Sequence, residues 1–236
     1  MTAVSDYWWQ SFRRIGDIRV FHVDLTPNAD REVEAYTWLD GPERSRWERF
    51  NSLPARRRFV LCRAALRAEI ARHLSCANEE LDFVASEHGK PFARVRGKSA
   101  CYSFNVSHSG KHGLIAIASD GRLGVDVEER APRKNLDLLI QGVFSPLEIA
   151  ELEQLKGAQK LFEFFRFWTI KEALVKAQGK GLSFKMAELE IPADMRHGAT
   201  KGNCQILQMP NVTWNLEDIS TIQFAAAVAH ESESAS

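Results

Sequence analysis

Apolar residues recur at helical spacing over residues 54–74 and predict a long helix. Phe59, Leu66, Ile70 and Leu74 fall on one stripe, so this face of the helix should be buried. A shorter, charged helix is expected just before it, at 43–50.

Strands are predicted on either side of these helices. Alternation over 18–25 indicates one strand, and a second is expected at 81–84. Residues 113–119 are almost wholly apolar, so this strand should be buried on both faces. The dipeptide Asp120-Gly121 then predicts a hairpin turn into another strand at 123–128.

The second half starts its helices with clearer signals. Ser145-Pro146-Leu147-Glu148 combines an N-cap serine, an early proline and a capping-box glutamate, and predicts a helix to about Leu155. Residues 160–178 predict the strongest helix of the chain, which Gly179 should cap. Three candidate strands follow, at 188–191, 204–209 and 222–229.

Each half thus has a long helix, a Gly-Lys turn and then strands. This order favours an α/β fold of the α+β kind, built from two similar subdomains. We place them at 1–110 and 111–230, and we expect the polar tail 231–236 to be disordered.

Composition narrows the class of protein. The 236 residues include 31 Lys and Arg and 31 Asp and Glu, so the formal net charge is zero, and 44% of residues are hydrophobic. These values argue against disorder and against a general nucleic-acid surface. The four cysteines form no CxxC pair, which is typical of reduced core residues in a cytoplasmic protein.

No targeting or membrane segment is expected. The residues after Tyr7-Trp8-Trp9 are polar and basic rather than the apolar run of a secretory signal. The longest apolar stretches, such as 224–229, fall far below the ~20 residues of a membrane span.

The first candidate for chemistry is Gly124-Val125-Asp126-Val127-Glu128. Residues two apart on a strand share a face, so Val125 and Val127 should point into the core and Asp126 and Glu128 together away from it. Paired carboxylates suit Mg²⁺. The same pattern also fits a solvated edge strand.

The second candidate is the helix over 164–176. Trp168, Glu172 and Lys176 lie four residues apart and share one face. An exposed Glu–Lys pair, worth only ~0.2–0.5 kcal/mol, is the simpler interpretation. However, the four aromatic residues of this segment indicate a largely buried helix, in which charges need partners.

The third candidate is the segment 104–110, Phe-Asn-Val-Ser-His-Ser-Gly. Ser107 and His108 are adjacent on an extended chain and point to opposite faces, which argues against a nucleophilic Ser–His pair. Hydroxyl, imidazole and free backbone N–H groups at a turn suit phosphate oxygens, although a purely structural turn fits equally well. Basic residues that could form a pocket for a small polyanion are spread over several segments: Arg44, Arg46, Arg56, Arg57, Arg58, Lys90, Lys171 and Lys176.

Five segments, in this order, resemble the Sfp-type 4′-phosphopantetheinyl transferase family. Its pattern Trp-x-x-Lys-Glu-Ala-x-x-x-Lys is the most specific of them. The matching strings are HGKPF (88–92), FNVSHSG (104–110), GVDVE (124–128), FSPLE (144–148) and FFRFWTIKEALVKAQGKGL (164–182).

The resemblance implies two α/β subdomains related by a pseudo-twofold axis, with coenzyme A in the cleft between them. It implies transfer of the 4′-phosphopantetheine arm to a serine of an acyl or peptidyl carrier protein, with release of 3′,5′-ADP. Such carriers serve fatty acid, polyketide and nonribosomal peptide synthesis. The segment from about Asn135 to Leu155 is where the carrier should dock.

Site residues follow from the same resemblance. Asp126, Glu128 and Glu172 would hold Mg²⁺ on the pyrophosphate, and Glu172 would be the nearest base for the incoming serine. Asp126, Glu172 and Lys176 form the expected catalytic set. The expected coenzyme A contacts are Arg44, Arg58, Ser107 and His108 at the 3′-phosphate, Lys90 and Pro91 at the adenosine, and Lys171 and Lys176; within the arginine-rich segment 43–49, Arg44 and Arg46 are both open as phosphate ligands.

Two other functions use the same residues. A Mg²⁺-dependent nucleotide pyrophosphohydrolase would use the same carboxylates with water as nucleophile. A non-catalytic module would only bind coenzyme A or a carrier. In each case we expect a cytoplasmic monomer that binds neither nucleic acid nor membrane.

Overall fold

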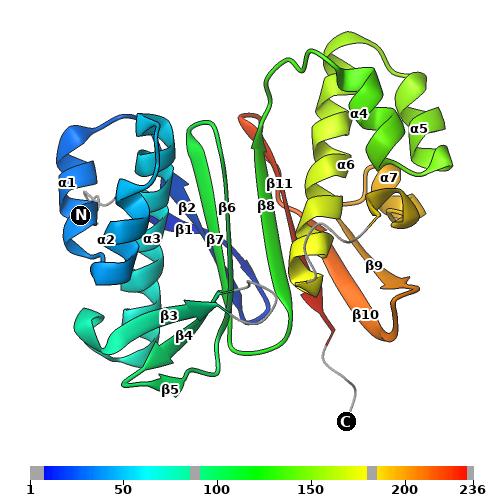
Figure 1. Cartoon of the computed structure of the whole chain (residues 1–236). Coiled ribbons are helices and arrows are strands. Elements are labelled where there is room, and N and C mark those ends of the chain that lie inside the picture. The colour runs from blue at the N-terminus through cyan, green and yellow to red at the C-terminus, as the bar shows by residue number, and fades with distance from the viewer. Residues whose placement is uncertain (1–7, 86–90, 180–184, 233–236) are drawn as a thin grey trace, which may run out of the picture.

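Two four-stranded antiparallel sheets form the centre of the molecule, and a long helix packs on each (Figure 1). The computed structural model describes residues 8–85, 91–179 and 185–232. None of the helices in these ranges is both long and apolar enough to cross a membrane.

The first half carries its helices on one side of a sheet with the order β1-β2-β7-β6. A small sheet, β3-β4-β5, extends it at one end. The elements are β1 (Trp9–Ile15), β2 (Ile18–Asp24), α1 (Ala29–Thr37), α2 (Gly41–Glu48), α3 (Leu53–Leu74), β3 (Leu81–Ala85), β4 (Pro91–Val95), β5 (Lys98–Ser99), β6 (Ser103–Ser109) and β7 (His112–Ala118).

The second half repeats this plan with a sheet of order β8-β11-β10-β9. Its helices α4 and α5 lie beside α6, away from the first half (Figure 1). The elements are β8 (Leu123–Glu129), α4 (Leu136–Val143), α5 (Pro146–Glu153), α6 (Gly157–Gln178), the 3₁₀ turn η3 (Met186–Glu188), α7 (Ala193–Arg196), β9 (Lys201–Ile206), β10 (Met209–Asp218) and β11 (Phe224–Glu231).

The two halves share a topology. In each, a strand (β2 or β8) precedes a helix of 22 residues, and the last strand of that half (β7 or β11) pairs antiparallel with that strand. Thus β2-β7-β6 with α3 corresponds to β8-β11-β10 with α6. The repeat agrees with the predicted pair of similar subdomains.

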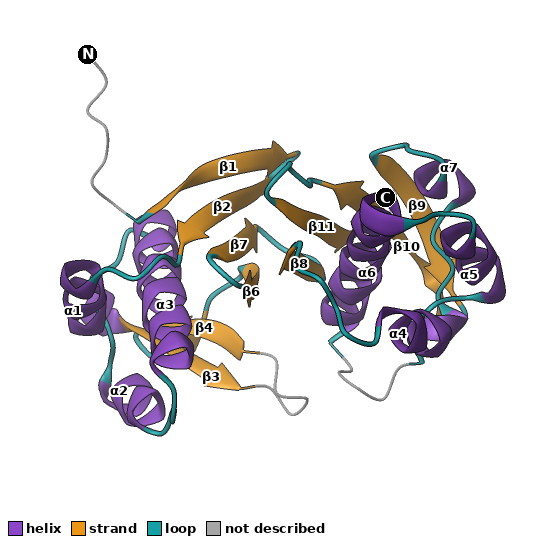
Figure 2. Ribbon diagram, turned by 90° about the horizontal axis from the view of Figure 1, so that it is seen from above, coloured by secondary structure: helices purple, strands orange, loops and turns teal. Residues whose placement is uncertain are grey.

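Side chains, rather than a backbone ladder, connect the sheets where β6 and β8 lie side by side (Figure 2). The Asn105 side-chain oxygen accepts a hydrogen bond from the Val125 N–H at 3.0 Å. The Ser107 hydroxyl accepts one from the Val127 N–H at 3.3 Å. These bonds satisfy backbone donors that would otherwise be orphaned at a buried sheet edge.

Apolar residues between the two sheets form a shared core. Val20 of β2, Leu114 of β7, Val125 and Val127 of β8 and Val228 of β11 are all buried in it. Each long helix covers the opposite face of its own sheet, in a separate cluster. The predicted inward direction of Val125 and Val127 is therefore confirmed.

Most predicted elements are present, but four expectations were wrong. The candidate strand at 204–209 spans the turn between β9, which ends at Ile206, and β10, which begins at Met209. Asp120-Gly121 does make a turn, yet it leads from one sheet to the other, because β2 and β6 already occupy both edges of β7. The sheets consequently divide at 119–122 and not at 110–111. Residues 188–191 form no strand: they follow η3 and lead into α7.

The tail needs a smaller correction. Glu231 is the last residue of β11 and pairs with Trp214, so the segment that we expected to be disordered begins inside a strand. Residues 233–236 lie outside the described residues. All four cysteines are free thiols, as predicted, but only Cys62 is a buried core residue and Cys101 is exposed.

Candidate active site

A pocket of about 310 Å³ opens where β6, β8 and α6 meet. In Figure 2 these elements lie in the middle of the molecule, with α3 on the other side of β6. The pocket gathers residues from three segments that are distant in sequence. Its lining is Val106, Ser107, His108, Asp126, Glu128, Trp168, Glu172 and Lys176.

Small residues bring the helix close to the strand. A Cβ added to Gly124 would collide with the Ala173 carbonyl and the Ala177 nitrogen of α6. On β11, Ala225, Ala227 and Ala229 present only methyl groups to the cluster around α6. This close approach brings the carboxylate face of β8 up against the Glu172–Lys176 face of the helix.

Asp126, Ser107 and Lys176 form one hydrogen-bonded group. The Lys176 ammonium donates to Asp126 Oδ1 at 2.6 Å and to Ser107 Oγ at 2.8 Å. The Ser107 hydroxyl donates to the same Asp126 oxygen at 2.8 Å. Lys176 therefore reaches from the helix across the pocket to both strands.

Glu128 lies one strand position further along the same face. Ser109 Oγ donates to its Oε2 at 2.7 Å, and Arg133, from the segment after β8, pairs with that oxygen at 3.0 Å. Ser107 and Ser109 thus each donate a hydrogen bond to one of the two carboxylates of β8. This role of Ser109 was not predicted from the sequence, although Ser107 and Ser109 are two residues apart, as are Asp126 and Glu128.

Burial raises the pKa of each of the three carboxyl groups. At Asp126 it outweighs the opposing effect of the Lys176 ammonium. At Glu172 and at Glu128 the charge of Asp126 adds to the effect of burial, whereas the Ser109 hydrogen bond opposes it at Glu128. Within the described residues the side chain of Glu172 makes no hydrogen bond or ion pair. A cation placed among these groups would reverse the shifts, because it favours the ionised forms.

The donor set fits a hard divalent cation. Asp126 Oδ2 is buried and has no hydrogen-bond partner in the described part of the chain, an arrangement that a cation would satisfy. Carboxylate oxygens are the ligands that Mg²⁺ prefers. As the side chains stand, no three His, Cys, Asp or Glu residues in the described ranges converge on one point, and the Lys176 ammonium occupies the position nearest Asp126.

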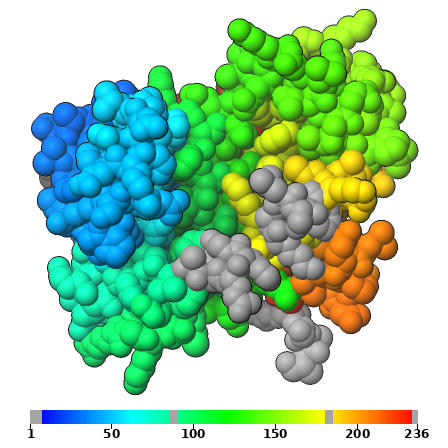
Figure 3. Space-filling model, viewed as in Figure 1, coloured from blue at the N-terminus to red at the C-terminus, as the bar shows by residue number. Residues whose placement is uncertain are grey.

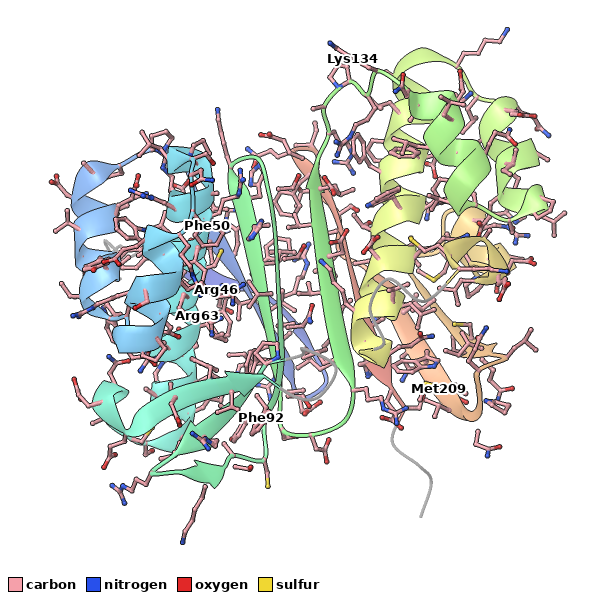
Figure 4. All side chains as sticks on the ribbon, in the orientation of Figure 1. Arg46, Phe50, Arg63, Phe92, Lys134 and Met209 are labelled. Atoms are coloured by element: carbon pink, nitrogen blue, oxygen red, sulfur yellow. The ribbon has the colours of Figure 1, made fainter. Side chains whose placement is uncertain are left out.

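A second, basic pocket of about 160 Å³ adjoins the first, and the two share Val106 and His108. Three guanidinium groups contribute to it, from Arg46, Arg58 and Arg63. Figure 4 labels Arg46 and Arg63, which lie close together between the helices of the first half and the central strands. No acidic side chain lines this pocket, so it suits an anion.

Two of these arginines keep their charge free for a ligand. In the described residues Arg46 and Arg58 form no ion pair, and Arg46 only stacks over Phe59 at 5.2 Å. Arg63 is paired with Glu43 at 3.4 Å and stacks over Phe83 at 4.6 Å. Burial lowers the pKa of His108, and Arg58 and Lys176 lower it further, so its neutral form is favoured until an anion binds.

The structure brings most predicted site residues together. Asp126, Glu128, Glu172, Lys176 and Ser107 share the first pocket, and His108 lines both pockets. Arg58 lines the second.

Among the described residues, the remaining predicted coenzyme contacts line neither pocket. Arg44 stacks over Tyr36 outside the basic pocket, whereas Arg46 lines it, so the geometry favours Arg46 as the phosphate ligand. Lys171 does not line either pocket, because its ammonium is buried on another face of α6. Pro91 begins β4, and Lys90 lies outside the described residues.

Arg63 was missed by the sequence analysis. It lies four residues after Phe59 and three before Leu66, so it interrupts the apolar stripe of α3. A charged residue in a buried stripe was the signal that could have identified it.

A larger cavity, of about 710 Å³, lies near the β1–β2 and β7–β8 turns. Arg122 pairs there with Glu231, Lys201 pairs with Glu217, and Asp17 accepts hydrogen bonds from Ser119. The arginine and the lysine of this cavity are thus engaged, whereas Arg46 and Arg58 of the basic pocket form no ion pair in the described residues. The smaller pair of pockets is therefore the better candidate site.

Comparison with known families covers both halves. A model described as "4′-phosphopantetheinyl transferase, N-terminal" matches residues 25–120, and one described as "4′-phosphopantetheinyl transferase superfamily" matches 122–229. The division between the two matches falls at the turn that separates the two sheets.

Curated relatives carry the same enzyme name. A Synechocystis sp. protein, provisionally named a 4′-phosphopantetheinyl transferase, is 38% identical over 145 residues, which are 61% of this chain and 58% of the relative. The 4′-phosphopantetheinyl transferase HetI of Nostoc sp. is 31% identical over 175 residues, 74% of this chain and 73% of HetI. The 4′-phosphopantetheinyl transferase psf-1 of Bacillus pumilus is 30% identical over 176 residues, 72% of each.

Proposed function

This chain belongs to the 4′-phosphopantetheinyl transferase family of enzymes, and from that premise we propose that it transfers the 4′-phosphopantetheine arm of coenzyme A to a serine of an acyl or peptidyl carrier protein. The reaction depends on Mg²⁺ and releases 3′,5′-ADP. The enzyme acts as a monomer in the cytoplasm, where its free thiols stay reduced.

The adjoining pockets carry this proposal. Coenzyme A has a pyrophosphate and a separate 3′-phosphate, so it needs two anion sites a short distance apart. The carboxylate pocket with Lys176 suits a metal-bound pyrophosphate, and the pocket of Arg46, Arg58 and Arg63 suits the 3′-phosphate. His108 lies at their junction and can contact either group.

Asp126, Glu128 and Glu172 would hold the Mg²⁺ ion. The ion would offset the mutual repulsion of the three carboxylates and neutralise charge on the phosphate oxygens. The unpartnered Oδ2 of Asp126 supports a ligand at this position.

The protein's own groups then position the substrates. Lys176 neutralises charge on the leaving phosphate. Ser107 hydrogen-bonds to both Lys176 and Asp126 and so fixes their relative positions. Glu172 accepts the proton of the incoming serine hydroxyl, directly or through a water molecule. Its side chain has no hydrogen-bonding partner in the described residues, which leaves the carboxylate free to act as a general base.

The carrier protein docks on the segment from Asn135 to Leu155, which contains α4 and α5. Two large apolar side chains are exposed there, Leu138 at 73% and Leu147 at 55% of full accessibility. Exposed leucines on neighbouring helices are suited to an apolar partner surface. Figure 3 shows these elements on the upper part of the second half.

A panel of apo carrier proteins tests the proposal. Each carrier is incubated with the enzyme, coenzyme A and Mg²⁺, and its intact mass is measured. We expect a covalent gain of the phosphopantetheine arm that disappears with EDTA and in Asp126→Ala. Breakdown of coenzyme A without any carrier would instead indicate a pyrophosphohydrolase, and binding without either reaction would indicate a non-catalytic module.

A further inference from the structure

Lys171 precedes the candidate base Glu172 on α6, but its ammonium is buried and points away from the pocket. Its exposed fraction is 1%. The Nζ group pairs with the Glu148 carboxylate and donates to the carbonyl oxygens of Val143, at 3.2 Å, and Met186, at 3.1 Å. An ammonium has three N–H donors, so these acceptors use all of them.

Glu148 is equally enclosed, with an exposed fraction of 0%. Its Oε2 accepts from the Ser145 N–H at 2.8 Å, and its Oε1 accepts from the Ile191 N–H at 2.8 Å. The pair therefore ties α6 to the end of α4, the start of α5 and the chain between η3 and α7. We call Lys171 and Glu148 the second-half clamp.

The first half contains the same device. Arg67 is the fifteenth residue of α3, as Lys171 is of α6, and it pairs with Glu43 at 2.9 Å. Glu43 and Glu148 are each the third residue of a short helix, where each completes a capping box. Because both halves keep a buried cation at this position, the cation belongs to the architecture and not to coenzyme A binding.

The second-half clamp fixes the rotation of α6 about its axis. Adjacent residues on a helix differ by about 100° in direction. Holding Lys171 on the α4–α5 side therefore holds Glu172 and Lys176 toward the pocket. The same contacts hold α4 and α5, the carrier-docking elements of the proposed function, against the catalytic helix.

We propose that Lys171 is a positioning residue that, with Glu148, sets the docking helices α4 and α5 relative to Glu172, and that it does not contact coenzyme A. This inference rests on the proposed function. A positioning residue of this kind would affect how the carrier is bound, whereas a direct ligand of coenzyme A would affect how coenzyme A is bound.

Steady-state kinetics of Lys171→Met and Glu148→Gln separate these roles, with the carrier that the wild type modifies best. We expect both variants to lower kcat and raise the KM for the carrier, each by about tenfold, with the KM for coenzyme A within about twofold of wild type. The double variant should be no worse than either single one, because the pair acts as a unit.

Three outcomes would overturn the inference. A raised KM for coenzyme A in Lys171→Met alone would make Lys171 a direct ligand. Lower thermal stability in both variants with unchanged kinetics would reduce the clamp to a structural role. A double variant whose defect is the sum of the single defects would show two independent residues.

Arg67→Met is the matched control, since it removes the corresponding cation from the first half. It should lower thermal stability as Lys171→Met does and leave the KM for the carrier unchanged. If Lys171→Met does not fold, the near-isosteric Glu148→Gln carries the test alone. Failure of the wild type to modify any carrier would instead refute the proposed function.

Discussion

At the scale of single residues, the three carboxylates of the pocket are not equivalent. Asp126 is held by Lys176 and Ser107, and Glu128 by Ser109 and Arg133, whereas Glu172 makes no such contact in the described part of the chain. A carboxylate that makes no such contact is the one best able to exchange a proton. Under the proposed function, this difference favours Glu172 for proton transfer and Asp126 for ion binding.

Glu172→Gln tests this division of roles. The amide keeps the shape of the side chain but cannot take a proton, so turnover should fall by about 10²–10³-fold while coenzyme A affinity weakens only a few-fold. Turnover is followed by intact mass of the carrier, and affinity by titration calorimetry with Mg²⁺. Unchanged turnover would remove Glu172 from both the base and the metal-ligand roles.

The basic pocket gives a second prediction at this scale. Arg46 lines it and Arg44 does not, so Arg46→Ala should raise the KM for coenzyme A by about tenfold and Arg44→Ala by less than about twofold. The contrast should vanish with dephospho-coenzyme A, which lacks the 3′-phosphate. A difference that persists with this substrate would mean that Arg46 serves another part of the ligand.

At the scale of elements, the contact between β8 and α6 positions the site. The strand supplies Asp126 and Glu128, the helix supplies Glu172 and Lys176, and Gly124 sets the spacing between them. No rotation of a side chain can relieve the clash there, because an added Cβ would meet backbone atoms of the helix.

Gly124→Ala should therefore lower the free energy of unfolding by about 1–3 kcal/mol or more, because the helix must move outward. Turnover should fall with it, since Glu172 and Lys176 move too. Urea denaturation and carrier mass provide the two readouts. The matched control is Gly142→Ala in α4, where nothing lies within 4 Å of an added Cβ. This variant should raise the free energy of unfolding by about 0.5–1 kcal/mol. Equal effects of the two substitutions would contradict the close-contact argument.

Elements with a strong local signal were predictable, and those that depend on tertiary context were not. The stripe of α3 and the capping box of α5 follow from nearby residues, so their sequences were sufficient. The turn at Asp120-Gly121 was also read correctly, but its local pattern does not specify which strands pair. The strands β1, β4, β5, β6 and β10 were missed, since their polar positions suit loops and turns as well as half-exposed strands.

The site shows the same limit. Spacing alone placed Asp126 with Glu128, and Glu172 with Lys176, on common faces. It could not show that the two faces meet, because that depends on packing between β8 and α6. The resemblance grouped Lys171 with the coenzyme contacts, yet only the burial of its ammonium reveals that it faces α5.

At the scale of the whole molecule, a pair of histidines lies where the two sheets pack together. His22 of β2 and His112 of β7 are 3.0 Å apart, measured between Nε2 and Nδ1. Both rings contact Phe224 of β11, in the other sheet. Burial lowers the pKa of both histidines, and the charge of His112 lowers that of His22 further, although Asp24 and, at His112, Glu129 oppose these shifts.

Acid should therefore loosen the contact between the halves. The folded state lowers these pKa values, so the unfolded chain binds more protons as the pH falls below about 6.5. The histidine contribution to stability is complete above that pH and is lost as the pH falls from there through the lowered pKa values of the folded state. The buried carboxyls Asp126, Glu128 and Glu172 act oppositely at lower pH, since their raised pKa values let the folded state take up protons first. The difference in unfolding free energy between wild type and His112→Gln isolates the histidine effect, because both proteins keep the carboxyls. Between about pH 7 and pH 5 the wild type should lose more stability than the variant; parallel curves would mean that the pair does not titrate with folding.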